Sequence, residues 1–169
     1  MNFIKKKPSF SKSDLMRLAL SENDYTTVLE KSDFVNREIL LTSINPTIAD
    51  NIDRVIRFWN DVDEQEGELV SNNARTPIKI YIDCVGGGSL TGMFTIIDAI
   101  KMSKTPVYTI NIGSTYKEAL FVYLAGHKRY SYPRASFLYK KDLKPFNMDE
   151  DAESNYVNFC DKQMQELKH

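Results

Sequence analysis

Strand-like and helix-like segments alternate along this chain from Arg37 onward, and this alternation constrains the fold more than any other feature. Short apolar runs rich in β-branched residues predict strands, and longer segments with apolar residues three or four positions apart predict helices. The expected order is strand 39–42, helix 46–60, strand 78–83, helix 90–102, strand 107–112 and helix 117–125. Because a helix follows each strand, the predicted fold class is α/β, with a largely parallel sheet covered by helices.

The ends of the chain are less regular. Residues 1–36 are expected to form a peripheral N-terminal arm, with a helix at 11–20 and a strand at 26–29, and residues 37–169 to form the main domain. Within that domain, Asn45 and Pro46 make a good helix cap and first turn. The acidic and then polar stretch 61–77 is expected to be a solvated loop, and helical spacing predicts a long final helix at 149–168.

Composition excludes several classes of function. The chain has 169 residues, 42% of them hydrophobic, which suits one globular domain with a real core. Its formal net charge of −1 gives no bulk attraction to nucleic acid or to an anionic membrane. No apolar run reaches the length of a signal peptide or a membrane span, so a soluble cytoplasmic protein is expected. Cys84 and Cys160 are predicted to be buried thiols, and neither a metal nor a cofactor is expected.

Two glycine-containing turns follow predicted strands. Gly86, Gly87 and Gly88 come after the strand at 78–83, and Gly113 closes the strand at 107–112. The first cluster lacks the Gly-Lys-Ser/Thr ending of a phosphate-binding loop and the GxGxxG dinucleotide pattern. Turns after neighbouring parallel strands share the carboxyl edge of a sheet, where α/β proteins assemble their sites. A functional site is therefore expected at this edge.

Three motifs together resemble one family. Residues 81–88 (YIDCVGGG) resemble the Y-I-N-S-P-G-G segment of the Clp protease proteolytic subunit (ClpP) family. Residues 113–126 match that family's G-x-A-x-S-x-G-A-x-x-x-x-A-G segment without a gap, and Lys128, Arg129 and Pro133 match its K-R-x-x-x-P segment. The resemblance extends from about Arg37 to the end of the chain. It implies a ClpP/crotonase-like fold of repeated β-β-α units, with 149–168 as the long handle helix after which the domain is truncated.

Carried over position by position, the resemblance places lysines at the family's nucleophile and base positions. Lys117 takes the place of the nucleophilic serine and Lys140 that of the histidine base. Gly88 or Gly87 corresponds to the oxyanion-hole glycine, and Glu118 follows the nucleophile position, where the family supplies its second oxyanion amide. The family's acidic residue would lie beyond His169. None of these positions is predicted to be catalytically competent.

The substitutions disfavour peptide hydrolysis, because a lysine has no hydroxyl with which to form an acyl ester. Glu118 is expected instead to neutralise one of the lysines. The leading hypothesis is therefore a noncatalytic subunit, a pseudo-peptidase, with an assembly or regulatory role in a Clp-type proteolytic complex. The resemblance implies a homo-oligomer or a mixed ring with an active paralogue, and an ATP-driven unfoldase as a partner.

Three alternatives remain open. Ser114 and Lys117 form the S-x-x-K spacing in which a lysine assists a serine nucleophile, so an active endopeptidase with nonstandard residues is the first. The second is a crotonase-like acyl-CoA enzyme that uses Glu118 as its base. The third is a shortened gene product without independent function. His127 lies in a turn and is expected to be a surface residue.

Overall fold

The computed structural model describes residues 25–66, 75–85, 89–139 and 162. The chain divides into two compact units, Met1–Glu38 and Ile39–His169. The described part of the first unit contains helix α2 (Tyr25–Val35), where the sequence predicts a strand at 26–29, and that prediction is wrong. The run of β-branched residues Thr26, Thr27 and Val28 favours a strand only weakly, because strand preference reflects packing against neighbouring strands. The expected helix at 11–20 lies outside the described residues.

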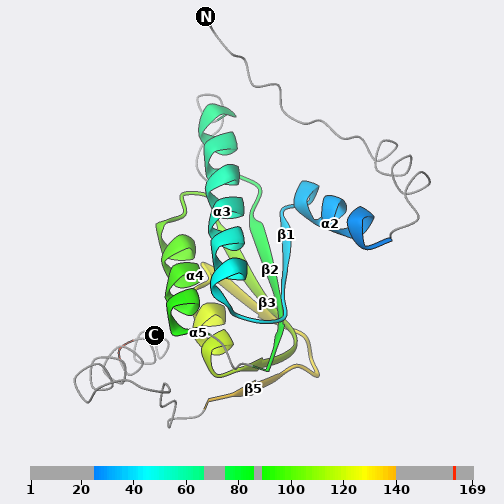
Figure 1. Cartoon of the computed structure of the whole chain (residues 1–169), viewed down its shortest axis with the longest axis vertical. Coiled ribbons are helices and arrows are strands. Elements are labelled where there is room, and N and C mark those ends of the chain that lie inside the picture. The colour runs from blue at the N-terminus through cyan, green and yellow to red at the C-terminus, as the bar shows by residue number, and fades with distance from the viewer. Residues whose placement is uncertain (1–24, 67–74, 86–88, 140–161, 163–169) are drawn as a thin grey trace, which may run out of the picture. The chain divides into compact units, whose positions relative to one another are not determined.

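The second unit is a single sheet with helices on one of its faces (Figure 1). Strands lie in the order β1 (Glu38–Leu41), β2 (Ile78–Cys84), β3 (Val107–Tyr116) and β4 (Lys128–Ser131), and β5 (Ser136–Leu138) also pairs with β3. β3 runs parallel to β2, β4 and β5. The predicted α/β class with a largely parallel sheet is confirmed.

In the described part of the chain, three helices cover the sheet: α3 (Pro46–Glu66), α4 (Leu90–Met102) and α5 (Glu118–Ala125). The predicted cap of α3 is present, because Asn45 Oδ1 accepts a hydrogen bond of 2.9 Å from the Ile48 amide. α4 has the predicted bounds, and its cap residue Ser89 accepts a bond of 3.1 Å from the Gly92 amide. The expected final helix at 149–168 lies outside the described residues, apart from Lys162.

α3 continues six residues beyond its predicted end at Asn60. The predicted loop is wrong for residues 61–66, because the buried stripe of the helix continues through Trp59 to Asp63, which is only 6% exposed. Asp63 is tolerated there because the Thr105 hydroxyl donates a hydrogen bond of 2.7 Å to its carboxylate. A partner from the segment between α4 and β3 thus allows an acidic residue on the buried face of a helix.

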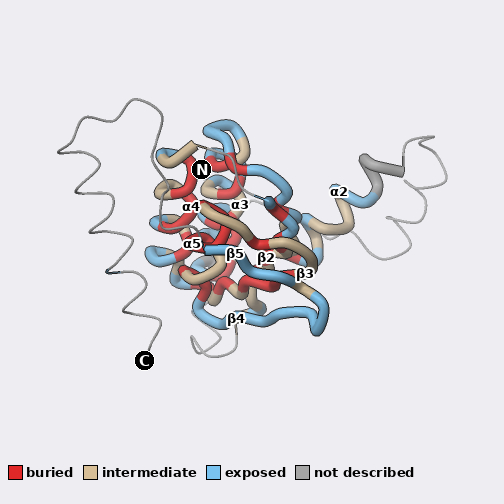
Figure 2. Tube along the Cα trace, turned by 90° about the horizontal axis from the view of Figure 1, so that it is seen from below, coloured by how far each residue is buried: buried red, intermediate tan, exposed pale blue. Residues whose placement is uncertain are grey.

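The core lies between the helices and the face of the sheet that they cover (Figure 2). Along β2 the side chains alternate, so that Ile78, Ile80 and Ile82 are fully buried while the intervening residues are not. Cys84 belongs to the same core, as predicted. The edge strands β4 and β5, which the sequence analysis does not predict, are exposed throughout.

Candidate functional site

The ends of β2 and β3 lie side by side. The two strands pair in parallel from Ile78 with Val107 to Ile82 with Asn111, and the register then shifts so that Cys84 pairs with Thr115. The carboxyl ends of both strands therefore meet at one edge of the sheet, which is where a site was expected. Gly86, Gly87 and Gly88, which follow β2, lie outside the described residues.

Hydrogen bonds hold the last part of β3 in place. The Asp83 carboxylate at the end of β2 accepts a bond of 2.8 Å from the Ser114 amide. A Cβ atom on Gly113 would lie 2.6 Å from Asp83 Cγ, so a larger residue there would displace the Asp83 carboxylate. Asn111, fully buried, accepts a bond of 3.1 Å from the Gly113 amide and donates one of 3.0 Å to the Ser136 carbonyl. These contacts connect β2, β3 and β5 just before the turn to α5.

Lys117 occupies that turn in a strained backbone conformation. Its φ is 51° and its ψ is −122°, a combination that L-amino acids rarely adopt, and it is the cap residue of α5. The Lys117 amide donates a bond of 3.1 Å to the Leu138 carbonyl in β5, and its carbonyl accepts one of 3.0 Å from the Leu120 amide. Strain of this kind persists where the surroundings determine the backbone, and it concentrates at functional sites.

Glu118 opens α5 and is 8% exposed. A carboxylate in the first turn of a helix is favoured by the partial positive charge at the helix N-terminus. The expected pairing of Glu118 with one of the lysines stays a prediction, because Lys140 lies outside the described residues.

Ser114 lies within β3, three residues before the cap of α5. Strand alternation puts Ser114 on the same side of β3 as Tyr116. The Tyr116 hydroxyl lies 3.0 Å from Ser136 Oγ, and hydrogen bonds from Ser136 and then from Ser114 lower the pKa of Tyr116. Ser114 thus interacts with a tyrosine in the same strand.

Two polar residues at opposite ends of β3 have surroundings that the sequence alone did not indicate. Thr115 is fully buried, and its hydroxyl has no hydrogen-bond partner in the described structure. His127 is exposed, as expected, but its Nδ1 accepts a bond of 3.0 Å from the Val107 amide, while its own amide donates one of 2.9 Å to the Val107 carbonyl. His127 therefore fixes the start of β4 beside the start of β3. The sequence places His127 just beyond the cap of a helix but gives no sign of this bond.

The described residues contain no group of three or more His, Cys, Asp or Glu side chains placed to hold a metal ion. No helix within the described ranges is long and apolar enough to cross a membrane.

Comparison with known proteins gives consistent matches. Residues 40–167 match the model of the Clp protease family. The ATP-dependent Clp protease proteolytic subunit 2 of Treponema denticola is 34% identical over 125 residues, which cover 72% of this chain and 56% of that protein. Its namesake from Borreliella burgdorferi is 31% identical over 97 residues, covering 56% of this chain and 48% of that protein. The chain therefore spans about half the length of these relatives.

Solved structures resemble this one in fold. ClpP1 from Listeria monocytogenes matches with a TM-score of 0.64 at 20% identity, over 82% of this chain and 75% of that one. The ClpP protease catalytic domain from Plasmodium falciparum matches with a TM-score of 0.61 at 24% identity, over 80% of this chain and 68% of that one.

Proposed function

Because the chain belongs to the Clp protease family, we propose that it is a noncatalytic subunit, a pseudo-peptidase, that acts in the assembly or regulation of a Clp-type proteolytic complex. The observation that carries the proposal is the position of Lys117. It lies on a strained strand-to-helix turn, the kind of turn on which acyl-transfer enzymes present their nucleophile. A lysine at that position offers no hydroxyl for an acyl ester.

The retained framework supports a role in assembly. The hydrogen bonds that hold the turn, from the Ser114 amide to Asp83 and from Asn111 to the Ser136 carbonyl, involve backbone groups and do not depend on the nucleophile. A chain that loses its chemistry but keeps this scaffold can still associate through the surfaces of the fold. Its partners would be further copies of itself or an active paralogue, together with an ATP-driven unfoldase, in the cytoplasm. Residues 37–169 would form the associating domain and residues 1–36 an arm.

Reactivity toward a serine-directed probe tests the absence of catalysis. The full chain is incubated with a fluorophosphonate probe and with fluorogenic peptides, and we expect neither covalent labelling nor hydrolysis above the buffer rate. Labelling that disappears in Ser114→Ala but persists in Ser131→Ala would overturn the proposal. Ser131 is the matched control because it is an exposed serine in β4, away from the turn.

Light scattering tests the assembly role. The chain is sized alone and after mixing with a catalytically active member of the family, and we expect either self-association or entry into a mixed particle. A monodisperse monomer that leaves the partner's mass and peptidase rate unchanged would rule out this role.

An active peptidase using Ser114 with Lys117 is the second candidate, and the S-x-x-K spacing favours it. The local backbone geometry of Ser114 and Lys117 argues against this candidate. Ser114 is a strand residue on the same side of β3 as Tyr116, whereas the spacing puts serine and lysine on one face only when both are in a helix. A crotonase-like acyl-CoA enzyme with Glu118 as base would be revealed by calorimetric binding of an acyl-CoA, which we expect to be absent.

A further inference from the structure

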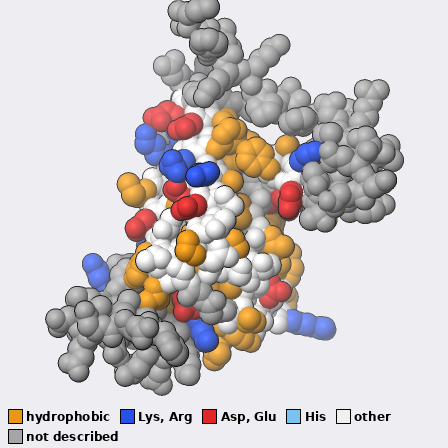
Figure 3. Space-filling model, in the orientation of Figure 1, with side chains coloured by type: hydrophobic (Ala, Val, Ile, Leu, Met, Phe, Trp, Pro, Cys, Tyr) orange, Lys and Arg blue, Asp and Glu red, His pale blue; other side chains and the backbone are white. Residues whose placement is uncertain are grey.

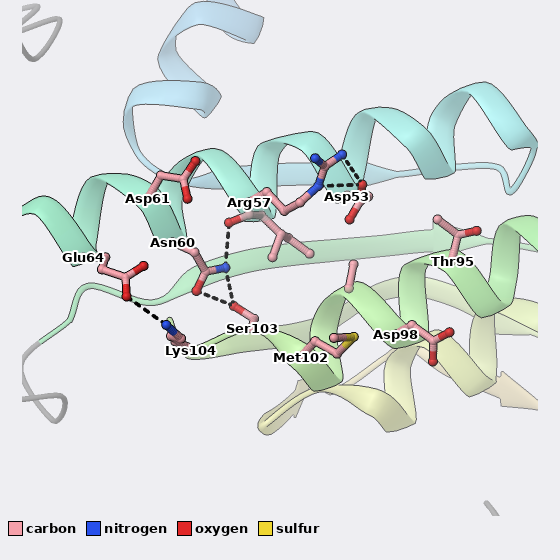
Figure 4. A pocket seen from close by; sticks show the side chains of 12 residues that line it. Asp53, Arg57, Asn60, Asp61, Glu64, Thr95, Asp98, Met102, Ser103 and Lys104 are labelled. Carbon is pink, nitrogen blue, oxygen red and sulfur yellow. Dashed lines mark hydrogen bonds and ion pairs between the residues drawn. The ribbon is translucent and has the colours of Figure 1, made fainter. Parts of the chain in front are cut away.

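Charged side chains gather on the surface over α3 and α4 (Figure 3). A groove of about 740 Å³ lies between these two helices (Figure 4). The two cations of its lining, Arg57 and Lys104, already lie in ion pairs with Asp53 and Glu64. Side chains whose chemistry the proposed function does not use lie elsewhere, at the end of β3.

Three hydroxyl groups meet on the face of the sheet that the helices leave uncovered. Side chains alternate along β3, and Thr115 is fully buried on the helix side, so Ser114 and Tyr116 lie on the other face. In β5, Ser136 pairs in register with Ser114. The Tyr116 hydroxyl lies 3.0 Å from Ser136 Oγ and also bonds to the Ser114 side chain. Two serines from neighbouring strands therefore contact one phenol.

The serine contacts make this phenol more acidic than that of an ordinary tyrosine. Hydrogen bonds from Ser136 and then from Ser114 stabilise the phenolate and lower the pKa of Tyr116, although desolvation acts in the opposite direction. Tyr123 on α5 gives the contrast, because burial raises the pKa of its phenol. A larger fraction of Tyr116 is therefore ionised at a given pH, and the ionised oxygen is the stronger nucleophile.

The chemistry of acyl transfer decides which groups such a phenolate can take. After a nucleophile attacks an acyl carbonyl, the tetrahedral intermediate expels its better leaving group. A phenolate leaves more readily than an amide nitrogen, so attack on a peptide bond would return the peptide unchanged. An aryl ester or an acyl phosphate carries a leaving group that departs at least as readily as the phenolate, and its acyl group would stay on the tyrosine.

We propose that Tyr116 is an acyl-acceptor site that takes an acyl group from an activated donor, an aryl ester or an acyl phosphate. The phenolate oxygen forms a bond to the acyl carbon, and the bond from that carbon to the leaving group breaks. The leaving group departs with the electron pair, the phenolic proton goes to solvent, and the product is a tyrosyl ester. The inference goes beyond the proposed function, since it requires neither peptide hydrolysis nor assembly.

Acetylation of the full chain by p-nitrophenyl acetate tests the site. The chain is treated at mildly alkaline pH and digested, and the acetylated residues are located by mass spectrometry. Hydroxylamine then separates tyrosyl esters, which it cleaves, from lysine amides, which it leaves intact. We expect Tyr116 to be acetylated at least about threefold faster than Tyr132, although Tyr132 is 55% exposed and Tyr116 is half-buried.

Substitutions identify the cause of this reactivity. Ser136→Ala is expected to slow acetylation of Tyr116 by about threefold, because it removes the hydrogen bond that stabilises the phenolate most, and Ser114→Ala is expected to slow it less. Ser43→Ala is the matched control, because Ser43 is an exposed serine between β1 and α3, and its effect is expected to stay within about 1.5-fold. Circular dichroism checks that each variant is folded.

The inference is wrong if Tyr132 reacts as fast as Tyr116, or if Tyr116→Phe leaves the number of hydroxylamine-labile acetyl groups unchanged. It is also wrong if Ser43→Ala slows acetylation of Tyr116 as much as Ser136→Ala does, or if folded Ser136→Ala and Ser114→Ala both react at the parent rate.

Discussion

The backbone of Lys117 adopts a conformation that suits glycine better than lysine. A φ of 51° with a ψ of −122° places the Cβ atom close to neighbouring backbone atoms, which costs about 1–3 kcal/mol in a non-glycine residue. The hydrogen bonds to Leu138 and Leu120 hold the turn in spite of this cost. Stability is therefore not the reason for a lysine at this position.

Lys117→Gly is accordingly expected to raise the free energy of unfolding by about 1 kcal/mol, because relief of strain exceeds the added entropy of the unfolded chain. Chemical denaturation of the full chain measures the change. Arg54→Gly, at an exposed position inside α3, is the control and is expected to lower the same quantity by about 1 kcal/mol. If both variants lose stability equally, the Lys117 side chain has a packing role.

The hydroxyl of Tyr116 is expected to ionise at lower pH than an ordinary tyrosine. Hydrogen bonds from Ser136 and from Ser114 stabilise its phenolate and lower its pKa. Ser136→Ala should therefore move that pKa up toward 10.0, its ordinary value.

The absorbance difference between the parent protein and Tyr116→Phe follows this titration. A pKa lowered by folding adds stability above the ordinary pKa, and the addition is lost as pH falls through the folded value. Ser136→Ala should therefore lose part of this contribution to stability at alkaline pH, above the ordinary value of 10.0. An unshifted titration in Ser136→Ala would contradict the assignment.

At the scale of elements, Asn60 connects α3 to the segment between α4 and β3. Its side chain bonds to the Ile56 carbonyl, to Ser103 Oγ and to the Thr105 amide. Thr105 is fully buried, so its amide has no water to replace Asn60. The end of α3 and the start of β3 thus depend on one amide side chain.

Asn60→Ala is expected to lower the free energy of unfolding by about 2 kcal/mol, because it leaves the buried Thr105 amide without a partner. Asn51→Ala on the same helix is the control, since Asn51 is exposed, and we expect a change within about 0.5 kcal/mol. Thermal and denaturant unfolding measure the free energy of unfolding of the two variants. Equal losses in both would mean that Asn60 acts only through helix propensity.

Helices with a clear apolar stripe could be predicted closely from the sequence. α4 has its predicted bounds because Met93, Ile96, Ile97 and Ile100 recur at helical spacing behind a serine cap. α2 was missed because its β-branched start resembles a strand, and local preference is weak in short segments. β4 and β5 were missed because they are short, exposed edge strands, formed by pairing with β3.

At the scale of the whole molecule, the hydrophobic core belongs to one unit. The buried core cluster runs from Leu41 to Ala125, and the described apolar residues that pack against it lie between Ile39 and Leu124. A domain that contains its own core can fold independently.

Removal of residues 1–36 is therefore expected to leave a cooperative unfolding transition, with the free energy of unfolding of residues 37–169 changed by no more than about 1 kcal/mol. Calorimetry and circular dichroism of the shortened and full chains make the comparison. Loss of the cooperative transition would show that the first 36 residues complete the core, and the proposed division into arm and domain would be wrong.

The sequence by itself determined the fold class, the alternating order of strands and helices, and the family resemblance. The first two follow from the spacing of apolar residues, and the third follows from short motifs around glycine turns. Only the tertiary structure decided the strain at Lys117 and the burial of Asp63 beside Thr105. Each of these depends on groups that are distant in the chain and meet only after folding: β5 with the turn to α5, and α3 with the end of α4. These contacts cannot be predicted from the local sequence, because backbone strain and charge balance depend on residues that are neighbours in space.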